Sequence, residues 1–443
     1  MKKYNNYKDS GIEWIGDLPE HWEVKKLKYL VKEPLKYGAN ESAEEEILED
    51  PRYIRITDFG NDGKLKNDTF KSLSFEKAEN FLLKEGDVLF ARSGATVGKT
   101  FLFKDYSGIA CFAGYLIKAS CDLDKMKPEF LYEFTNSGGY ENWKQSIFQQ
   151  STIQNIGADK YNQLKIGVPS ISEQKLIINY LDHKTTQIDT LIAKKEQFIS
   201  LLQEERTAVI NQAVTKGLDP KVKLKDSGIE WLGEIPEHWE VKRLKHLVKT
   251  PLKYGANESA EDEILEDPRY IRITDFGNDG KLRKSTFKSL SFDKAENFLL
   301  EEGDILFARS GATVGKTFFF KDYQGVACFA GYLIKATCNP MIMKAEFLYE
   351  FTNSSGYENW KQSIFQQSTI QNIGADKYNQ LKIGVPSLIE QQGIIVFISK
   401  KTNEINILIS KAEQEIELLK EYKTALISEV VTGKIDVRDV VLN

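Results

Sequence analysis

The stretch KDSGIEWIGDLPEHWEVKKLKYL, residues 8–30, returns as KDSGIEWLGEIPEHWEVKRLKHL at residues 225–247. The same shift of 217 positions aligns residues 8–169 with 225–386 without a gap, and 23 of these 162 positions differ, so about 86% are identical. A repeat this long is a duplicated domain, because the units of solenoid proteins have only about 20–50 residues. The chain is therefore predicted to contain two copies of one domain.

The overall composition is that of a globular protein. Of the 443 residues, 41% are hydrophobic and 28% are charged, which is enough apolar material for packed cores. No apolar run approaches the roughly 20 residues of a membrane span, and no apolar segment follows the basic start as it would in a signal peptide. The four cysteines have neither the short spacing of a zinc site nor the density of a disulfide framework, so we expect them to be reduced and buried. These features predict a cytosolic protein with no membrane partner.

Each copy combines strand-like and helical segments. In the first copy, apolar runs at 51–57, 86–92, 99–105 and 109–119 are bounded by Gly, Asn and Asp, which predicts strands. Residues 127–151 have the spacing of a helix. Each copy is therefore predicted to be an α/β domain.

Each copy is followed by a segment with the periodicity of a long helix. Apolar residues recur at spacings of three, four and seven over 171–217 and again over 388–434, and 21 of these 47 positions are identical. Ser170 or Ser172 can cap the first helix, which spans roughly 65 Å if it is not broken near Asp182. A lone helix of this kind would leave its apolar stripe in water, so the two helices are predicted to pack on each other as an antiparallel, coiled-coil-like pair. The residues predicted to pack in this pair are Ile188, Leu191, Ile192, Ile199, Leu202, Val209, Ile405, Leu408, Ile409, Ile416, Leu419 and Leu426.

The predicted fold class is therefore α+β: two α/β domains, each followed by a long helix, with pseudo-two-fold symmetry. The first domain is expected at 1–169 and the first helical region at 170–216. A linker and the second domain follow at 217–386, and the second helical region at 387–443.

The repeated stretch ARSGATVGKT, at 91–100 and 308–317, has only a superficial likeness to a phosphate-binding loop. A Walker loop has four residues between its first Gly and the Gly-Lys-Thr, whereas Gly94 and Gly98 enclose three. An apolar run follows the loop in place of the helix that would direct N–H groups at phosphate. The pattern favours a strand–turn–strand in which the glycines supply positive φ. A second interpretation is a turn that presents polar side chains to an anionic partner, and these are Arg92, Ser93, Thr96 and Lys99.

No catalytic or metal-binding pattern stands out. Two of the four histidines, His21 and His238, lie in the repeated PEHWEV, where packing beside Trp is favoured. The chain has no GxSxG, HExxH, Asn-Pro-Pro-aromatic or FxGxG pattern. We therefore predict no catalytic site, no metal site and no cofactor.

Several motifs point to a known family. KDSGIEWIGDLPEHWEVKKLKYL, YIRITDFGNDG, GDVLFARSGATVGK and IGVPSISEQ followed by a long helix, together with the C-terminal TGKIDVR, resemble the specificity subunit of a type I restriction–modification enzyme. The resemblance covers nearly the whole chain in the family's order, in which two target-recognition domains alternate with two conserved helical regions. It implies a subunit that has no cofactor, catalyses nothing and reads a bipartite sequence in double-stranded DNA. It also implies partners: two methylation subunits, which modify adenine N6, and restriction subunits through the complex.

The chain departs from the family in one respect, because the two recognition domains commonly differ and here they are nearly identical. Proteins with two-fold symmetry read equal half-sites on opposite DNA strands. The sequence therefore predicts an interrupted palindrome as the target, with helix length setting the gap. The differences cluster at Lys66–Asp68 against Arg283–Ser285 and at Asp122–Lys125 against Asn339–Ile342, as in tolerant surface loops, with a base-reading loop as the alternative. Recent recombination is another explanation of the identity.

Candidates for DNA contact follow from side-chain chemistry. Arg pairs with guanine, and Asn or Gln pairs with adenine. The richest polar cluster is QQSTIQNI, identical at 149–156 and 366–373. A local cap or loop hydrogen bond competes with DNA contact at each position. In the first copy the candidates are Arg52, Arg55, Asn61, Arg92, Ser93, Thr96, Lys99, Gln149, Gln150, Ser151, Thr152, Gln154 and Asn155. In the second copy they are Arg269, Arg272, Asn278, Arg309, Ser310, Thr313, Lys316, Gln366, Gln367, Ser368, Thr369, Gln371 and Asn372.

The net charge of −5 agrees with DNA binding only if the charges are segregated. Residues 1–170 contain 24 basic and 26 acidic residues, and six of the acids lie in ESAEEEILED at 41–50. If this segment faces away from DNA, the remainder carries a charge of +4. Candidates for phosphate contacts are Lys25, Lys26, Lys28, Lys32 and Lys36, with an ordinary solvated face as the alternative.

Three other classes of function stay open. A stand-alone DNA-binding regulator would have the same helical seam and no methylation partner. An NTPase is disfavoured by the loop spacing, and a scaffold without a DNA role would leave the duplicated α/β domains unexplained.

Overall fold

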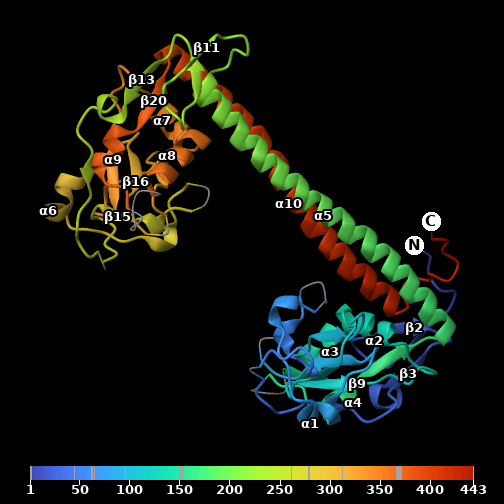
Figure 1. The fold of residues 1–443 in the computed structure, drawn as a ribbon. Coiled ribbons are helices and arrows are strands. Elements are labelled where there is room, and N and C mark those ends of the chain that lie inside the picture. Colours follow the sequence, from blue (N-terminus) through green and yellow to red (C-terminus); the bar gives the residue numbers. More distant parts are fainter. Residues whose placement is uncertain are drawn as a thin grey trace. The chain divides into compact units, whose positions relative to one another are not determined.

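A computed structural model describes residues 2–43, 45–60, 63, 65–94, 96–148, 154–260, 262–277, 280–311, 313–365 and 372–442. The chain forms two compact units. The first unit contains residues 1–195 and 413–443, and the second contains residues 196–412. Each unit therefore holds one copy of the repeat together with one end of each long helix (Figure 1).

The elements of the first copy run up to the first long helix, α5. The strands are β1 (Tyr7–Asp9), β2 (Asp17–Pro19), β3 (Glu23–Lys26), β4 (Lys36–Tyr37), β5 (Arg52–Ile54), β6 (Val88–Ala91), β7 (Thr100–Leu102), β8 (Ala110–Phe112), β9 (Leu116–Ala119) and β10 (Lys165–Val168). The helices are α1 (Phe75–Ala78), α2 (Pro128–Thr135), α3 (Gly138–Phe148), α4 (Ala158–Asn162) and α5 (Ile171–Lys216). Short 3₁₀ turns include η1 (Leu27–Tyr29) and η2 (Ile56–Asp58).

The second copy repeats this order. The strands are β11 (Leu224–Asp226), β12 (Glu234–Pro236), β13 (Glu240–Arg243), β14 (Lys253–Tyr254), β15 (Arg269–Ile271), β16 (Ile305–Ala308), β17 (Thr317–Phe319), β18 (Ala327–Phe329), β19 (Leu333–Ala336) and β20 (Lys382–Val385). The helices are α6 (Phe292–Ala295), α7 (Ala345–Phe351), α8 (Ser355–Phe365), α9 (Ala375–Gln380) and α10 (Leu388–Val431).

The centre of the first unit is an antiparallel sheet with the strand order β4-β9-β6-β7. All residues of β6 are buried, because the sheet is covered on both faces. Val88 and Phe90 pack into the cluster that contains α2 and α3, whereas Leu89 packs into a second cluster with Phe101 and Phe112. A strand covered on both faces reads as a continuous apolar run, which is why GDVLFAR shows no alternation. The second unit has the same order, β14-β19-β16-β17.

Two predicted segments are divided in the structure. The helical stretch 127–151 contains α2 and α3, and Ser137 separates them because its Oγ accepts the Tyr140 N–H at 3.3 Å. The strand-like run 109–119 contains β8 and β9. Between these strands the Leu116 N–H donates to the Ala113 carbonyl at 2.9 Å and closes a tight turn.

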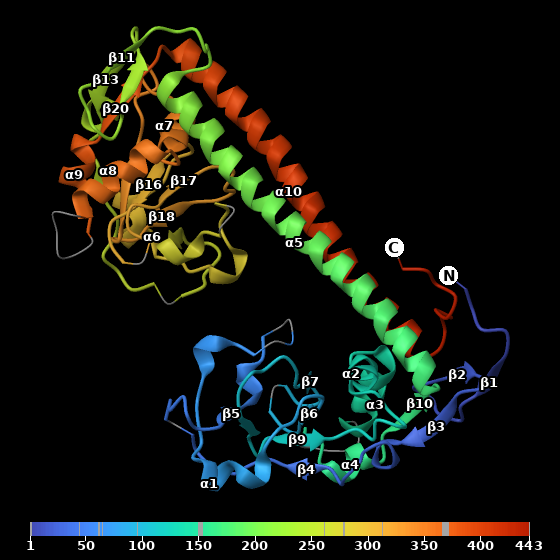
Figure 2. The same cartoon turned by 45° about the vertical axis from the view of Figure 1, so that its right-hand side comes forward.

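The first long helix, α5, is continuous past Asp182 and has 46 residues, or about 69 Å at 1.5 Å per residue. Ser170 caps it, since the Glu173 N–H donates to Ser170 Oγ at 3.3 Å. The buried amide of Gln174 ties its first turn to the loop before α2, donating to the Lys125 carbonyl at 3.0 Å. Figure 2 shows α2 and α3 beside this end of α5, where Ile177 and Leu181 pack into the same core.

The two long helices pack together and run antiparallel, as predicted. In the first unit, Lys423 Nζ of α10 lies 2.7 Å from Asp189 Oδ1 of α5, and Lys195 pairs with Glu415. As the residue number increases along α5, the residue number of its contact on α10 decreases, so the two helices are antiparallel. In the second unit, residues of α5 around Val214 share a core cluster with residues of α10 around Ile394.

The structure corrects two of the residues predicted to pack in the helix pair. Leu191 and Leu408 are 43% and 44% exposed. The less exposed α5 positions run through 188, 192, 195, 199 and 202 with alternating steps of four and three, and a residue one step before such a position points about 100° away from it. Buried members of the predicted set are Ile188, Leu202, Ile405, Ile416 and Leu426, and partly buried members are Ile192, Ile199, Val209, Ile409 and Leu419.

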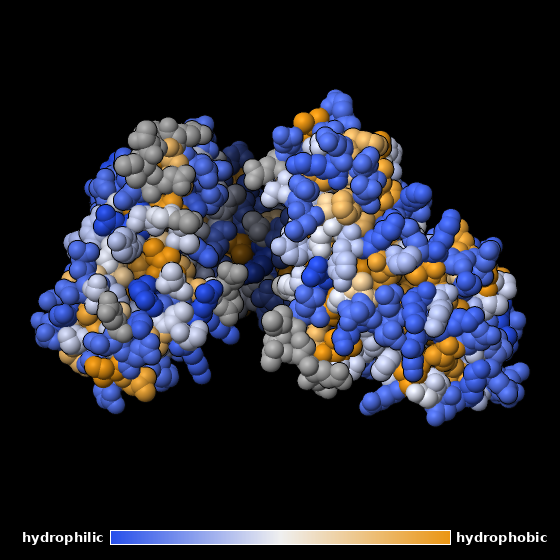
Figure 3. All heavy atoms as spheres, turned by 90° about the horizontal axis from the view of Figure 1, so that it is seen from below, coloured by the Kyte–Doolittle hydropathy of each residue, from blue (hydrophilic) through white to orange (hydrophobic). Residues whose placement is uncertain are grey.

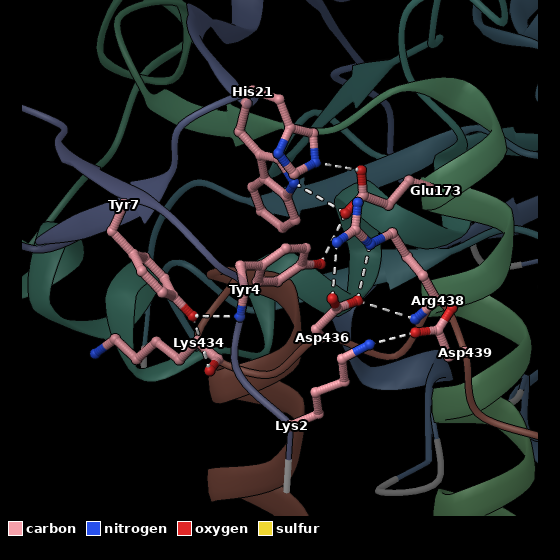
Figure 4. A network of polar contacts seen from close by, with 10 residues as sticks. Lys2, Tyr4, Tyr7, His21, Glu173, Lys434, Asp436, Arg438 and Asp439 are labelled. Carbon is pink, nitrogen blue, oxygen red and sulfur yellow. Dashed lines mark hydrogen bonds and ion pairs between the residues drawn. The ribbon is translucent and has the colours of Figure 1, made fainter.

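Both ends of the chain meet at the start of α5. Tyr4 donates its hydroxyl hydrogen to Glu173 Oε1 at 2.7 Å, and the Trp22 indole N–H donates to the same oxygen at 3.1 Å. His21 Nε2 lies 2.9 Å from Glu173 Oε2. The guanidinium of Arg438 stacks over the Tyr4 ring at 4.8 Å from the ring centroid. Figure 4 shows Tyr4 and His21 pointing toward Glu173, a carboxylate that these contacts bury.

The C-terminal segment is fixed to the N-terminal one by backbone and charge. The Asp436 N–H donates to the Lys2 carbonyl at 2.9 Å, and Lys2 pairs with Asp439 (Figure 4). Gly433 follows α10 with φ of +75°, and the Lys434 N–H donates to the Glu429 carbonyl at 2.8 Å, as in a Schellman cap.

The four cysteines are free and buried, as predicted. Burial raises the pKa of the Cys111 thiol to about 12. Across the described part of the chain, no helix combines the length and the apolar character that crossing a membrane requires.

Candidate nucleic-acid interface

The repeated ARSGATVGKT forms a tight turn between β6 and β7, which pair antiparallel with Phe90 opposite Thr100. Gly94 and Gly98 have φ of +83° and +81°, a conformation that is easy only for glycine. This is the predicted strand–turn–strand. Because a strand follows the turn, no helix N-terminus stands there to direct N–H groups at a phosphate.

The turn lies beside the described end of the QQSTIQNI cluster. Asn155 forms an antiparallel bridge with Ser93, and the Ile156 N–H donates to the Arg92 carbonyl at 2.8 Å. Two segments that are far apart in the sequence, both chosen for their polar chemistry, therefore share one surface. Gln154, Asn155 and Lys99 are exposed there, and Ser93 and Thr96 are partly exposed. In the second copy, Asn372 and Lys316 are exposed, and Ser310 and Thr313 are partly exposed.

Some predicted residues lie outside the described residues. They are Asn61, Gln149, Gln150, Ser151 and Thr152 in the first copy, and Asn278, Gln366, Gln367, Ser368, Thr369 and Gln371 in the second.

Arg92 is held against an aromatic ring. Its guanidinium carbon lies 5.0 Å from the centroid of Tyr37, within cation–π distance. The ring is fixed at both ends, because Tyr37 pairs with Ile117 in the sheet and its hydroxyl oxygen accepts the Ala158 N–H at 2.9 Å. Among the residues that the structure describes, no carboxylate pairs with Arg92. A preorganised arginine with unused donors can recognise an acceptor edge or a phosphate.

Tyr115 stands next to this arginine on a rigid backbone. The Arg92 N–H donates to the Tyr115 carbonyl at 3.0 Å, and the Gly114 N–H donates to the Ala39 carbonyl at 2.7 Å. The Tyr115 side chain is nevertheless 65% exposed. Rigid aromatic side chains give contact area at low entropic cost, which is a property of recognition surfaces.

We call this group the arginine–tyrosine corner, defined as Tyr37, Arg92, Tyr115 and Asn155 in the first copy. Its counterpart in the second copy is Tyr254, Arg309, Tyr332 and Asn372. There the guanidinium carbon of Arg309 lies 4.9 Å from the Tyr254 centroid, and Tyr332 is 64% exposed. The Arg309 N–H donates to the Tyr332 carbonyl at 3.0 Å. The two corners therefore have the same residues in the same geometry.

The sequence prediction missed both tyrosines of each corner. Tyr37 and Tyr115 lie far from the polar clusters in the sequence, and a tyrosine beside a buried strand normally reads as core. Only the pairing of β4, β9 and β6 places them around Arg92. The amino-acid sequence alone does not indicate that an aromatic side chain on a tight turn is exposed.

Arg52 and Arg269 are not available for DNA contact, which corrects the prediction. They are 3% and 4% exposed. The Arg52 guanidinium donates to the Lys66 carbonyl and stacks between Phe70 and Tyr106, at 5.7 and 5.6 Å from their centroids. Arg269 has the same environment. These arginines hold a loop against the domain core.

Arg55 and Arg272 are also occupied by structural contacts. Arg55 binds the fully buried Asp58 through two bonds, of 3.1 Å from Nε and 2.8 Å from Nη2, and its Nη2 also donates to the Thr69 carbonyl at 2.7 Å. Arg272 repeats these contacts with Asp275 and Thr286. The side chain closes a 3₁₀ turn, so its prediction as a DNA contact is corrected as well.

The lysines proposed for phosphate contacts differ in their surroundings. Lys25 pairs with Glu23 and Lys36 pairs with Glu33, at 2.6 and 2.8 Å. The pKa of the Glu33 carboxyl is lowered, chiefly by its bond to Lys36. Lys26 donates to Gln163, whereas Lys28 is exposed and lies 4.8 Å from the Tyr29 centroid. Lys32 is exposed as well, and no described carboxylate forms an ion pair with it, so Lys28 and Lys32 are better candidates than the other three.

The acidic segment 41–50 is anchored by lysines of its own domain. Glu46 pairs with Lys71 at 2.7 Å, which lowers the pKa of the Glu46 carboxyl, and Glu41 pairs with Lys77 at 3.3 Å.

Figure 3 shows that hydrophilic side chains dominate the face it draws, with apolar side chains in separate patches between them. Within the described residues, no group of His, Cys, Asp and Glu side chains is arranged to hold a metal ion.

Comparisons with known proteins agree with this architecture. The family model of the type I restriction modification DNA specificity domain matches residues 19–200 and again residues 236–418. The MjaVIII specificity subunit of a type I restriction enzyme of Methanocaldococcus jannaschii is 24% identical over 447 residues, 98% of each chain. The EcoKI specificity subunit of Escherichia coli is 28% identical over 183 residues, which cover 41% of this chain and 37% of that protein.

Solved structures show the same fold. A chain from a study of complex assembly and conformational transition of the type I R-M system matches with a TM-score of 0.72 at 14% identity, covering 94% of this chain and 99% of that chain. The HsdS subunit from Thermoanaerobacter tengcongensis matches with a TM-score of 0.56 at 15% identity, covering 94% and 98%.

A duplicated α/β domain with an antiparallel pair of long helices is the architecture of a DNA-specificity protein. The chain belongs to the family of type I restriction–modification DNA specificity subunits, the DNA-recognition and not the catalytic members of such systems. The resemblance stated from the sequence motifs is thereby confirmed.

Proposed function

We propose that this specificity subunit reads a bipartite DNA target, one half-site with each α/β domain, and that the two half-sites contain the same bases on opposite strands. The observation that carries the proposal is the identity of the two arginine–tyrosine corners, with Arg–Tyr distances of 5.0 and 4.9 Å. Equal reading surfaces recognise equal bases. The antiparallel direction of α5 and α10 supports the assignment to opposite strands.

We also propose that the helix pair docks two methylation subunits, which modify adenine N6, and through them restriction subunits. Apolar side chains are exposed along both helices. Leu191 and Leu418 are 43% and 63% exposed in the first unit, and Leu201 and Leu408 are 53% and 44% exposed in the second. Leucines that lie off the buried seam of a helix pair are typical of a surface that another protein covers.

The experiment is a map of N6-methyladenine in the DNA of cells that carry this chain with its methylation subunit, compared with cells that lack the chain. We expect a chain-dependent interrupted palindrome. Two unrelated half-sites would keep the subunit role and contradict the equal half-sites. Absence of chain-dependent methylation, together with failure to co-purify with a methylation subunit, would contradict the role itself and favour a stand-alone regulator.

A further inference from the structure

We infer that Arg92 and Arg309 each read a guanine in the major groove of one half-site. The rings of Tyr37 and Tyr254 hold the guanidinium groups, and the exposed side chains of Tyr115 and Tyr332 contact the neighbouring base. This inference rests on the proposed function and deepens it. It names one base of the target and the residues that read it.

The first step is that Arg92 differs from the other candidate arginines of its domain. Arg52 is buried and donates to a backbone carbonyl, and Arg55 is occupied by Asp58. Arg92 is partly exposed, its Nε is buried without a partner, and no described carboxylate or carbonyl accepts a hydrogen bond from its terminal nitrogens. Of these three arginines in the described part of the domain, it alone keeps both terminal guanidinium nitrogens for a ligand.

The second step is that the position of Arg92 is set before a ligand arrives. Its backbone is held on both sides, because its N–H donates to the Tyr115 carbonyl and its own carbonyl accepts the Ile156 N–H. Its side chain rests on the Tyr37 ring, which the Ala158 N–H fixes at the hydroxyl end. Such preorganisation reduces the entropy that binding would cost.

The third step concerns the choice between a base and a phosphate. A phosphate contact needs only a positive charge, and the flexible lysines nearby, such as Lys99, can make one. A fixed planar guanidinium suits a bidentate pair, and its most common partner on DNA is the O6 and N7 edge of guanine. Tyr115, whose carbonyl accepts the Arg92 N–H, has an exposed side chain that can offer an apolar surface to the adjacent base. The geometry therefore favours direct readout.

The test uses the duplicated structure as its own control. The full chain is expressed with its methylation subunit as wild type, as Arg309→Ala and as Arg92→Ala, and methylated sites are mapped. We expect a guanine at equivalent positions of both half-sites in the wild type. Each variant should lose the preference for that guanine in one half-site only, by about 5- to 150-fold, the discrimination of one good bidentate pair. The other half-site should be unchanged.

Arg309→Lys separates a base contact from a phosphate contact. Lysine keeps the charge, but it has neither the planar fork nor the stacking surface of arginine. We expect Arg309→Lys to relax the guanine preference nearly as far as Arg309→Ala. Full restoration of the motif by lysine, or weaker methylation at all sites with an unchanged motif, would identify a phosphate contact and overturn the inference.

A binding experiment covers the case in which the variants lose activity altogether. Duplexes of the mapped target with 7-deazaguanine, which lacks the N7 acceptor, are bound to the wild-type complex. One guanine of each half-site should weaken binding several-fold when it is replaced. If no guanine does so, or if the half-sites share no guanine, the inference is wrong. A wild type that directs no methylation at all would instead refute the proposed function.

Discussion

The hydroxyl of Tyr4 and the carboxylate of Glu173 meet at 2.7 Å although 169 positions separate them in the chain. In the second unit the equivalent carboxylate, Glu390, is bound by His238 and Trp239 in the same way, at 3.0 Å each. The position equivalent to Tyr4 is Lys221, which supplies no such hydroxyl. The Glu173 side chain is accordingly 5% exposed, whereas the Glu390 side chain is 27% exposed.

Replacing Tyr4 should therefore destabilise the first unit. Tyr4→Phe removes a hydrogen bond to a buried carboxylate, which contributes about 1.5–3 kcal/mol. The burial of Tyr4 and its bond to Glu173 both raise the pKa of the phenol. Urea unfolding measures the loss. Tyr7→Phe is the control for loss of a hydroxyl that does not touch the buried carboxylate. This hydroxyl donates to the Lys434 carbonyl at 3.3 Å in an exposed place and accepts the Tyr4 N–H at 3.1 Å, so a smaller loss is expected. Equal losses in the two variants would refute this account.

The stability of the first unit should depend on pH through Glu133. Burial, and then the nearby negative charge of Asp182, raise the pKa of the Glu133 carboxyl to about 7, although Lys423 and Lys104 oppose the shift. Between the unfolded value of about 4.5 and about 7, the folded protein keeps a proton that the unfolded chain has released. Stability therefore falls as the pH rises through this window, by up to about 3 kcal/mol.

Glu133→Gln should remove this dependence. The variant is expected to be more stable than the wild type at pH 8 and about equally stable at pH 4, as measured by urea unfolding across the range. Glu350→Gln is the counterpart in the second unit, where the pKa is raised to about 6 by burial and Arg206 and Lys321 oppose it. Its effect should be smaller. A variant whose pH profile parallels that of the wild type would contradict the assignment.

Arg272→Ala should impair folding of the second domain and leave base preference intact. The substitution leaves the buried Asp275 carboxylate without its bidentate partner, which lowers the free energy of unfolding by about 3–5 kcal/mol. Chemical unfolding measures the loss, and mapping of methylated sites at a permissive temperature measures base preference. A changed motif with unchanged stability would restore this arginine as a DNA contact.

Tyr332→Ala should weaken recognition of one half-site without changing the guanine preference. Tyr332 is 64% exposed, so removal of its ring should cost the fold little. Loss of a contact with a base edge should lower affinity by up to about 150-fold, since good base contacts in the major groove are worth about 1–3 kcal/mol. Binding to a synthetic duplex checks this, with Tyr332→Phe as the control that keeps the ring. Unaltered affinity in Tyr332→Ala would remove the tyrosine from the interface.

Leu408→Ser should reduce docking of the methylation subunit and leave the chain folded. Leu408 is 44% exposed, and surface substitutions of this kind change stability by about 0.5 kcal/mol or less. Co-purification measures docking. The matched variant Ile405→Ala, at a buried position of the same helix, should cost about 2–5 kcal/mol and retain docking. The reverse pattern would place the docking surface elsewhere.

Much of the fold can be predicted from the sequence because the repeat and the helical periodicity are strong signals. The repeat of residues 8–169 marks the duplication, and Ser170 marks the start of α5 by its capping chemistry. The strand–turn–strand predicted around Gly94 and Gly98 is confirmed by the pairing of β6 with β7. The short strands are less visible, since β8 and β9 form one apolar run whose turn carries only Gly114 as a signal.

The candidate site was harder to predict because the same side chain serves structure or recognition according to its neighbours. Arg55 and Asp58 are three residues apart, a spacing that allows a local pair but does not require one. The stack of Arg92 on Tyr37 arises from strand pairing between distant segments, which no local pattern encodes. The side-chain chemistry of arginine makes it a reasonable candidate for DNA contact. Which arginines have no structural partner depends on how distant segments pack together.

The composition of the first unit from two separate stretches has a consequence for biosynthesis. The second unit is a contiguous stretch, residues 196–412, and can complete its core as soon as that stretch has left the ribosome. The first unit, although its larger part is made first, lacks its share of α10 until residues 413–431 have been synthesised. Until then the core around Ile177 and Leu181 is incomplete, because Leu426 and Val430, which belong to the same core, have not yet been synthesised. The half of the molecule that is translated first is therefore the half that is finished last.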